Sequence, residues 1–199
     1  MRTLSILICL VILWSCEEKK QPLLGETPFQ KNMNAIFKDA STSPLKANDL
    51  RDFRGLDFFK HNEDFITTAF LERTPNSQWF DMKTTTDRLS KERVYGILSF
   101  NFKGKSFSLK VYQSEEQLNT EGQENDLFLP FLDNTNGNTT YGGGRYMNLK
   151  IPTGDSIQLD FNTAYNPYCA YNEKFSCPIV PRANYIDLEV TAGVKKYVK

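Results

Sequence analysis

Apolar and polar side chains alternate along much of the chain, and the alternation is clearest between residues 94 and 113. Every second position on either side of a Lys103-Gly104 turn is apolar: Leu98, Phe100, Phe102, Phe107, Leu109 and Val111. A period of two is typical of strands with one buried face. The segment therefore predicts two half-buried antiparallel strands joined by a tight turn.

The same period recurs in a second segment and in three shorter ones. The second segment alternates on both sides of a turn at residues 152–155, with Met147, Leu149 and Ile151 before it and Ile157, Leu159 and Phe161 after it. Residues 65–71, 127–132 and 186–190 predict three further strands. Because short turns and no helices separate these strands, we expect a mainly β fold, a single antiparallel β-sandwich or barrel-like domain with a short N-terminal helix.

A helical period precedes the strands. The apolar positions that form one helical face are Phe29, Met33, Ile36 and Phe37. Thr27-Pro28 supplies an N-cap and a proline at the first helical position. Pro44 then ends the helical segment, because it forces the residue before it into an extended form, and the helical period does not return.

The first sixteen residues indicate export. Residues 4–13 form an apolar run shorter than the roughly 20 residues of a spanning helix. The run ends in Leu13-Trp14-Ser15-Cys16, which resembles the bacterial lipobox, whose cysteine carries acyl chains such as palmitate. The alternative is an ordinary signal peptide in which Cys16 is incidental. We expect a lipoprotein signal peptide at 1–16, a solvated tether at 17–27 and one β-rich domain at 28–199.

This reading predicts a location in the bacterial cell envelope. Acyl chains on Cys16 would hold the protein at a membrane, and we expect this to be the outer membrane. Glu17-Glu18 resembles the surface-export signals of Bacteroidetes lipoproteins. The periplasmic and the surface side of that membrane both remain open at this stage.

Composition narrows the function further. Lys+Arg and Asp+Glu number 24 each and no basic run occurs, which argues against nucleic-acid binding. The single histidine, His61, lies in a polar turn and argues against multi-histidine metal sites. Asp87-Arg88 reads as a surface ion pair. We therefore expect no metal and no cofactor, and leave open whether the protein is an enzyme.

A glycine-rich loop at 133–146 offers the first candidate site. Three consecutive glycines, Gly142 to Gly144, allow backbone amides to converge on an anion, and Arg145 can bind a carboxylate or phosphate through two hydrogen bonds. Tyr141 lies beside them. The alternative is a hairpin loop in which the glycines permit tight turns and Arg145 pairs with a structural acid such as Asp160.

A second polar segment follows the last strong strand. Asp160, Asn162, Tyr165 and Asn166 fall within seven positions, a density of hydrogen-bonding groups that suits a binding site on a loop. The alternative is that the Asp and Asn side chains cap turns.

Two cysteines, Cys169 and Cys177, remain in the exported part of the chain once Cys9 of the signal and Cys16 are set aside. In an oxidising compartment such a pair is a disulfide candidate. Free buried thiols and a metal or redox role are the alternatives.

These segments resemble an uncharacterised bacterial family, number 1684 among the domains of unknown function. The matching residues are Asp133, Gly137, Thr140, Tyr141, Gly142, Gly144, Arg145, Asp160, Phe161, Asn162, Ala164, Tyr165, Asn166, Pro167, Cys169, Ala170, Cys177, Pro178, Pro181 and Asn184. Val194 stands where the family has a glutamate. The resemblance implies no known reaction, but it implies that the two polar segments form one shared feature.

Three hypotheses follow. In the first, Tyr141, Arg145, Asp160, Asn162, Tyr165 and Asn166 line a small pocket that binds a polar or anionic ligand. In the second, the protein is a hydrolase-like enzyme with Asp160 as general base and Arg145 stabilising negative charge. In the third, it is a structural or partner-binding lipoprotein, which a large exposed apolar patch would favour.

Overall fold

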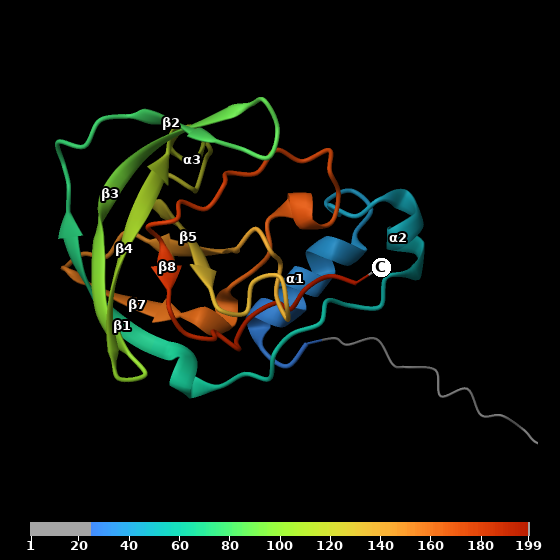
Figure 1. Ribbon diagram of the computed structural model, residues 1–199. Coiled ribbons are helices and arrows are strands. Elements are labelled where there is room, and N and C mark those ends of the chain that lie inside the picture. The colour runs from blue at the N-terminus through green and yellow to red at the C-terminus, as the bar shows by residue number, and fades with distance from the viewer. Residues whose placement is uncertain (1–24, 199) are drawn as a thin grey trace, which may run out of the picture.

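A computed structural model describes residues 25–198, which form one curled, antiparallel β-sheet shaped like half a barrel, with few helices (Figure 1). The mainly β fold with a barrel-like sheet is thus confirmed. The strand order is β6-β5-β4-β3-β1-β7, with β2 added beside β3 and β8 beside β5. The strands are β1 (Ile66–Arg73), β2 (Phe80–Lys83), β3 (Leu89–Phe102), β4 (Lys105–Ser114), β5 (Asp126–Asp133), β6 (Arg145–Lys150), β7 (Ser156–Asp160) and β8 (Tyr185–Ile186).

The hairpin predicted from the clearest alternation is confirmed as β3 and β4. Its strands pair antiparallel from Glu92↔Ser114 to Phe102↔Lys105, with a bulge between Val94 and Gly96. Lys103 and Gly104 both have positive φ, 48° and 79°, as the tightest hairpin turns require. The alternation buries Leu98, Phe100 and Phe102 on the inner face of the curl.

The second predicted hairpin is wrong in its pairing. Both strands exist, but β6 pairs with β5 and β7 pairs with β1, so they lie at opposite ends of the strand order. The turn at 152–155 therefore links the two ends of the curled sheet. A period of two identifies a strand and its buried face, but it carries no information about which strand lies beside it.

The remaining elements include one confirmed helix and several departures. Helix α1 (Pro28–Lys38) begins with a capping box between Thr27 and Gln30 and buries Met33 and Phe37. Helices α2 (Ala47–Asp52) and α3 (Glu115–Leu118) and strand β2 were not predicted. The strand expected at 186–190 is reduced to the two residues of β8, which run parallel to β5.

Three apolar clusters organise the interior of the described residues. The largest fills the hollow of the sheet and includes Leu98, Leu129 and Phe161, all fully buried. The second lies beneath α1 and joins Phe37 to Tyr171 and Val194 near the C-terminus. In Figure 1 the C-terminus accordingly lies on the same side of the molecule as α1 and α2. The third cluster includes Phe128 and Tyr146, which together with residues of α1 line a cavity.

The signal peptide, Cys16 and most of the tether lie outside the described residues. Within 25–198, no helix combines the length and the hydropathy that crossing a membrane requires. The anchor and the location inferred from the first sixteen residues therefore stay predictions.

Candidate functional site

Arg145, the leading candidate of the sequence analysis, is enclosed by protein. Its side chain is 0% exposed and forms an ion pair with Asp133, whose Oδ2 lies 2.8 Å from Nη2. Nη2 also donates to the backbone oxygen of Val190 at 2.7 Å, and Nη1 donates to that of Ala192. Burial lowers the pKa of Arg145, and the carboxylate of Asp133 opposes the shift. The partner is thus a structural acid, although it is Asp133 and not Asp160.

The glycine-rich loop holds this ion pair in place. Asp133 Oδ1 accepts a hydrogen bond from the backbone N–H of Thr135 at 2.8 Å and another from its hydroxyl. Gly144 has a φ of 88°, and a Cβ there would lie 2.7 Å from the backbone oxygen of Phe131. A glycine is therefore needed at Gly144 for close packing against β5. Gly142 and Gly143 are exposed.

The second polar segment binds other parts of the chain. Asp160 Oδ1 accepts hydrogen bonds from the backbone N–H and the side-chain amide of Asn162, which also bonds both backbone groups of Asn62. Asn166 Nδ2 donates to the hydroxyl of Tyr171 at 3.2 Å and to the backbone oxygen of Lys195 at 2.9 Å. These side chains join a helix cap, a loop and the C-terminal segment, as the capping alternative expected.

Of the six predicted ligand-binding residues, Tyr165 alone lines the large cavity described next. Its backbone pairs with that of Tyr146, and its hydroxyl donates to Asn148 Oδ1 at 2.8 Å. The hydroxyl of Tyr141 instead lies 3.9 Å from Cys169 Sγ. The two polar segments therefore share a region of the fold but do not converge on one pocket.

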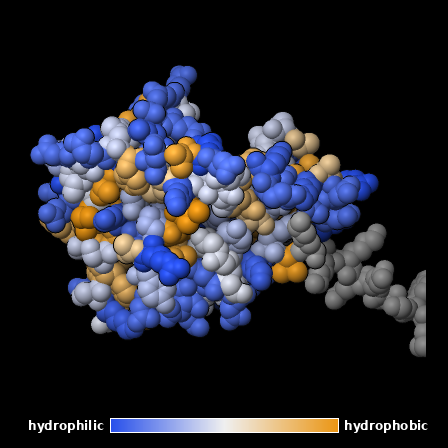
Figure 2. Space-filling model, turned by 45° about the horizontal axis from the view of Figure 1, so that its top comes forward, coloured by the Kyte–Doolittle hydropathy of each residue, from blue (hydrophilic) through white to orange (hydrophobic). Residues whose placement is uncertain are grey.

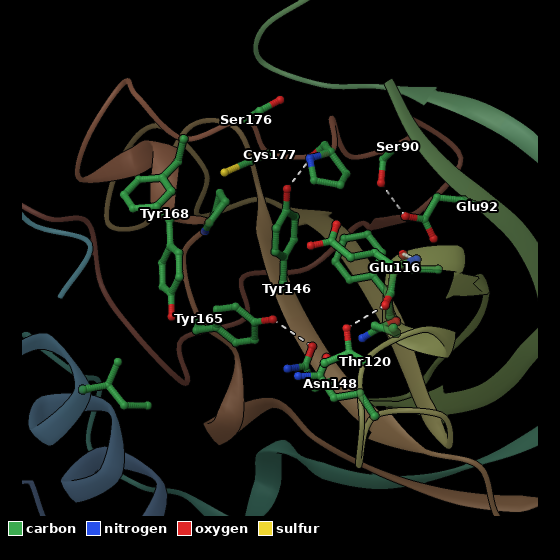
Figure 3. Close-up of a pocket in the computed structure, with 18 of the residues that line it drawn as sticks. Ser90, Glu92, Glu116, Thr120, Tyr146, Asn148, Tyr165, Tyr168, Ser176 and Cys177 are labelled. Carbon is green, nitrogen blue, oxygen red and sulfur yellow. Dashed lines mark hydrogen bonds between the residues drawn. The ribbon is translucent and has the colours of Figure 1, made fainter. Parts of the chain in front are cut away.

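A cavity of about 640 Å³ lies between α1 and the open side of the sheet. This volume is within the usual range for sites that bind small molecules. Figure 3 shows Ser90 and Glu92 of β3 on one side of the cavity and Tyr165 and Tyr168 on the other. The polar lining side chains include Arg88, Ser90, Glu92, Ser114, Glu116, Gln117, Thr120 and Asn148.

Glu92 is the most unusual group of this cavity. The residue is 1% exposed, and its Oε1 accepts a hydrogen bond from the Ser90 hydroxyl at 2.8 Å. Its Oε2 is buried and has no hydrogen-bond partner of normal geometry among the described residues. Desolvation raises the pKa of Glu92 to about 7, a shift that the hydroxyls of Ser90 and Ser114 offset only in part.

A second acceptor and two charges complete the polar side. Gln117 Oε1 is buried without a hydrogen-bond partner in the described chain. Glu116 is exposed, and its negative charge adds to the pKa shift of Glu92. Arg88 Nη1 lies 3.9 Å from Glu116 Oε2, so this pair of cavity-lining residues replaces the surface ion pair predicted between Arg88 and Asp87. Two buried oxygens without a hydrogen-bond partner thus belong to residues that line this cavity.

The opposite side of the cavity is aromatic and apolar. Phe29, Met33 and Ile36 of α1 contribute one wall. The sheet and the following loop contribute a second wall of rings: Phe128, Tyr146, Tyr165, Tyr168 and Phe175. Tyr146 and Tyr165 meet edge to face with ring centroids 5.9 Å apart. The cavity thus combines an aromatic and apolar wall with a polar one.

Cys177 also lines the cavity, and Cys169 lies behind it. Both are free thiols in the structure. The backbone N–H of Cys169 donates to Cys177 Sγ at 3.1 Å, so the two residues are neighbours in space. A disulfide between them stays a prediction.

The described residues contain no cluster of metal-binding side chains. Across residues 25–198 no group of three or more His, Cys, Asp or Glu side chains is placed to hold a metal ion. His61 Nε2 lies 2.8 Å from Glu63 Oε1 beside a smaller hollow, away from Glu92.

Comparison with known proteins identifies the family. Residues 51–195 match the family model described as Protein of unknown function (DUF1684). The chain belongs to this family. The matched region contains every strand of the DUF1684 sheet and the Glu92 side of the cavity, whereas helix α1 precedes it.

A solved structure supports the same fold. The chain is 34% identical to an uncharacterized protein of Haloarcula marismortui known from a solution NMR structure. The similarity covers 83% of this chain and 89% of that one, with a TM-score of 0.66. None of the curated proteins matches the chain. These comparisons establish a family and a fold, and they name no ligand or reaction.

The sequence analysis did not single out Glu92, although a signal was present. Ser90 and Glu92 alternate with polar neighbours at the start of β3, although the bulge between Val94 and Gly96 turns them to the opposite face of the sheet from Leu98 and Phe102. A carboxylate at a buried position of a strand is uncommon unless it is paired or functional. Arg88 and Gln117 gave no comparable signal, because only the fold brings them to the cavity.

Proposed function

We propose that this DUF1684 protein is an envelope lipoprotein, anchored through Cys16, whose cavity binds a small organic molecule that carries a hydrogen-bond donor, such as an ammonium group, beside an apolar or aromatic part. The observation that carries the proposal is Glu92 Oε2, an acceptor that is buried, unpaired and located in a cavity wall. A buried acceptor without a partner costs about 1 to 3 kcal/mol. A ligand that donates to it would recover that free energy.

The charges of the lining favour a donor over the anion considered from the sequence. Glu92 and Glu116 are acidic, and Arg88, the basic residue of this lining, already pairs with Glu116. An anion would approach two carboxylates without a free cation. The aromatic wall also suits an organic ammonium group, because ring faces attract cations.

The raised pKa of Glu92 favours a second candidate, an enzyme that uses this carboxyl group for proton transfer. A carboxyl group with a pKa of about 7 is present in both protonation states near neutral pH, as general acid-base catalysis requires. Asp160 and Arg145, the pair considered from the sequence, do not line the cavity. In this candidate Glu92 takes the place of Asp160.

A matched pair of probes tests the binding proposal. Isothermal titration of the purified full-length chain at pH 8 compares 2-phenylethylammonium with phenylacetate, which has the same ring and the opposite charge. We expect the ammonium probe to bind at least about tenfold more tightly, because a hydrogen bond to a charged partner is worth about 1.5 to 3 kcal/mol. Glu92→Gln should remove this preference.

The control for that titration is Glu72→Gln, which neutralises an exposed carboxylate of β1 outside the cavity. Its affinity for the ammonium probe should equal that of the unmodified protein. Equal binding of the two probes, or unchanged ammonium binding by Glu92→Gln, would show that Glu92 does not select the ligand. Consumption of a probe during the titration would favour the enzyme candidate.

A further inference from the structure

A second chemical feature adjoins the cavity and is independent of Glu92. Cys169 lies in the short 3-10 helix η3 (Tyr168–Ala170), and Cys177 lies in the loop that follows it. Cys177 Sγ accepts the backbone N–H of Cys169 at 3.1 Å. The Cys177 side chain lies near enough to the Cys169 sulfur to lower the pKa of Cys169. Two free thiols so close together are placed for a bond between their sulfur atoms.

The backbone on the Cys177 side is firmly held. The backbone N–H of Thr85 donates to the backbone oxygen of Cys177 at 2.9 Å, and the Thr85 hydroxyl accepts from the N–H of Cys177 at 3.1 Å. Two residues on, the N–H of Ile179 donates to the backbone oxygen of Lys83 at 2.8 Å. Closing a disulfide therefore requires movement mainly of the Cys169 side chain.

The two thiols differ in exposure and in ionisation. Cys169 is half-buried, whereas Cys177 is 6% exposed. The interaction with the Cys177 thiol, together with the hydrogen bond from the Tyr141 hydroxyl, lowers the pKa of Cys169 to about 6. The same interaction raises the pKa of Cys177. Desolvation raises the pKa of Tyr141 to about 12, so its hydroxyl stays protonated and donates.

We propose that Cys169 and Cys177 form a redox-active dithiol that reduces disulfide bonds. In the first step the Cys169 thiolate attacks one sulfur of a disulfide RSSR′, which forms a Cys169–SR mixed disulfide and releases R′S⁻. In the second step Cys177 loses its proton to water and attacks Cys169 Sγ, which forms the Cys169–Cys177 disulfide and releases RS⁻. The substrate disulfide gains two electrons, and the two cysteines lose them.

The geometry assigns distinct roles to the two cysteines. The accessible thiolate is the attacking group, and the enclosed thiol beside it resolves the mixed disulfide. Tyr141 is a positioning residue, because it acts through Cys169. The disulfide considered from the sequence is, in this proposal, the oxidised state of a pair that the structure holds reduced.

Glutathione disulfide is the probe that tests the proposal. The full-length chain is reduced, freed of reductant without air, and mixed with glutathione disulfide at pH 7. Reaction is stopped with acid and followed by mass spectrometry of tryptic peptides, since cleavage after Lys174 separates Cys169 from Cys177. We expect two released glutathione thiols for each Cys169–Cys177 disulfide that forms.

Single variants separate attack from resolution. Cys177→Ser should accumulate one glutathione on Cys169, because no thiol remains to release it. Cys169→Ser should react at Cys177 at least about tenfold more slowly than the unmodified chain reacts at Cys169, because an ordinary thiol is mostly protonated at neutral pH. Stable glutathione adducts on both cysteines of the unmodified chain, or no reaction at either, would overturn the proposal. So would equal rates in the two variants.

Tyr141→Phe tests whether Tyr141 acts on the ionisation of Cys169, which a purely structural role would leave unchanged. Alkylation of Cys169 by iodoacetamide is measured from pH 5 to 9 in the unmodified chain and in the variant. The unmodified rate should reach half its maximum near pH 6, and the variant should need a higher pH. A midpoint of the unmodified chain at the ordinary thiol value, near 8.5, would overturn the assignment of Cys169 as the attacking group.

Discussion

At the scale of single residues, two buried charged side chains behave in opposite ways. Arg145 is enclosed, and its two Nη atoms donate to Asp133 and to two backbone oxygens, whereas its Nε has no partner among the described residues. Glu92 is equally enclosed but leaves one oxygen unpaired at a cavity wall. A buried charge that has a counter-charge builds the fold, whereas a buried carboxylate without one beside a cavity suggests a ligand.

The Arg145–Asp133 pair predicts a large effect on stability. Asp133→Asn should lower the free energy of unfolding by about 3 to 5 kcal/mol, because it leaves the guanidinium buried without its counter-charge. Urea denaturation followed by circular dichroism measures the change. Asp81→Asn is the control, since Asp81 pairs with Lys91 at the surface and such pairs contribute less than about 1 kcal/mol. Similar losses in the two variants would contradict this role.

The buried carboxyl group of Glu92 predicts that the stability of the protein depends on pH. Its pKa rises from an ordinary value of 4.5 to about 7 on folding, so the folded state binds the proton more tightly and loses stability as the pH rises between these values. Glu92→Gln does not ionise. Its stability relative to the unmodified protein should therefore increase by about 3 kcal/mol between pH 4.5 and pH 8. Urea denaturation at both pH values gives this difference, and a constant difference would contradict the raised pKa.

At the scale of elements, the bulge in β3 positions the cavity residues. The register with β4 shifts between Val94 and Gly96, between the core part of the strand and the part that carries Ser90 and Glu92. β-Bulges bend a strand and re-aim its side chains. The Glu92 end of β3 thereby faces α1 and the cavity, while the other end covers the large apolar cluster.

Gly96 lies beside this bulge, where β3 packs closely against β1. A Cβ at Gly96 would lie 2.6 Å from the backbone oxygen of Glu72 and 2.6 Å from Leu71 Cδ1. Gly96→Ala should therefore destabilise the protein by about 1 to 3 kcal/mol. Gly154→Ala is the matched control, because nothing lies within 4 Å of its Cβ position and its φ is not positive. Thermal unfolding of both variants tests the contrast, which equal melting temperatures would refute.

At the scale of the whole molecule, the C-terminal segment joins α1 to the sheet. Val194 donates its N–H to the backbone oxygen of Ala164 at 2.9 Å and belongs to the cluster beneath α1. The backbone N–H of Lys196 donates to the backbone oxygen of Thr139 at 2.9 Å. The exposed surface in Figure 2 shows apolar side chains in small patches between hydrophilic ones. That face offers a large partner little apolar area, which favours the cavity as the functional feature.

The proposed anchor predicts where the whole protein is found. Labelled palmitate fed to producing cells should enter the unmodified protein, and the protein should sediment with membranes. Cys16→Ser removes the thiol that carries the acyl chains, so it should abolish labelling and release the processed protein from the membrane fraction. Cys9→Ser, within the apolar run, is the control and should change neither result. Labelling that persists in Cys16→Ser would contradict the anchor.

The sequence by itself determined the family, the short capped helix and most of the strands, because capping and period-two alternation depend on residues close in the chain. Only the tertiary structure decided that β6 and β7 lie apart, that Asp133 is the partner of Arg145, and that Glu92 and Gln117 share a cavity with α1. These facts depend on the curl of the sheet, which brings distant segments together. Local patterns identify which face of a strand is buried, but they do not identify what lies opposite it.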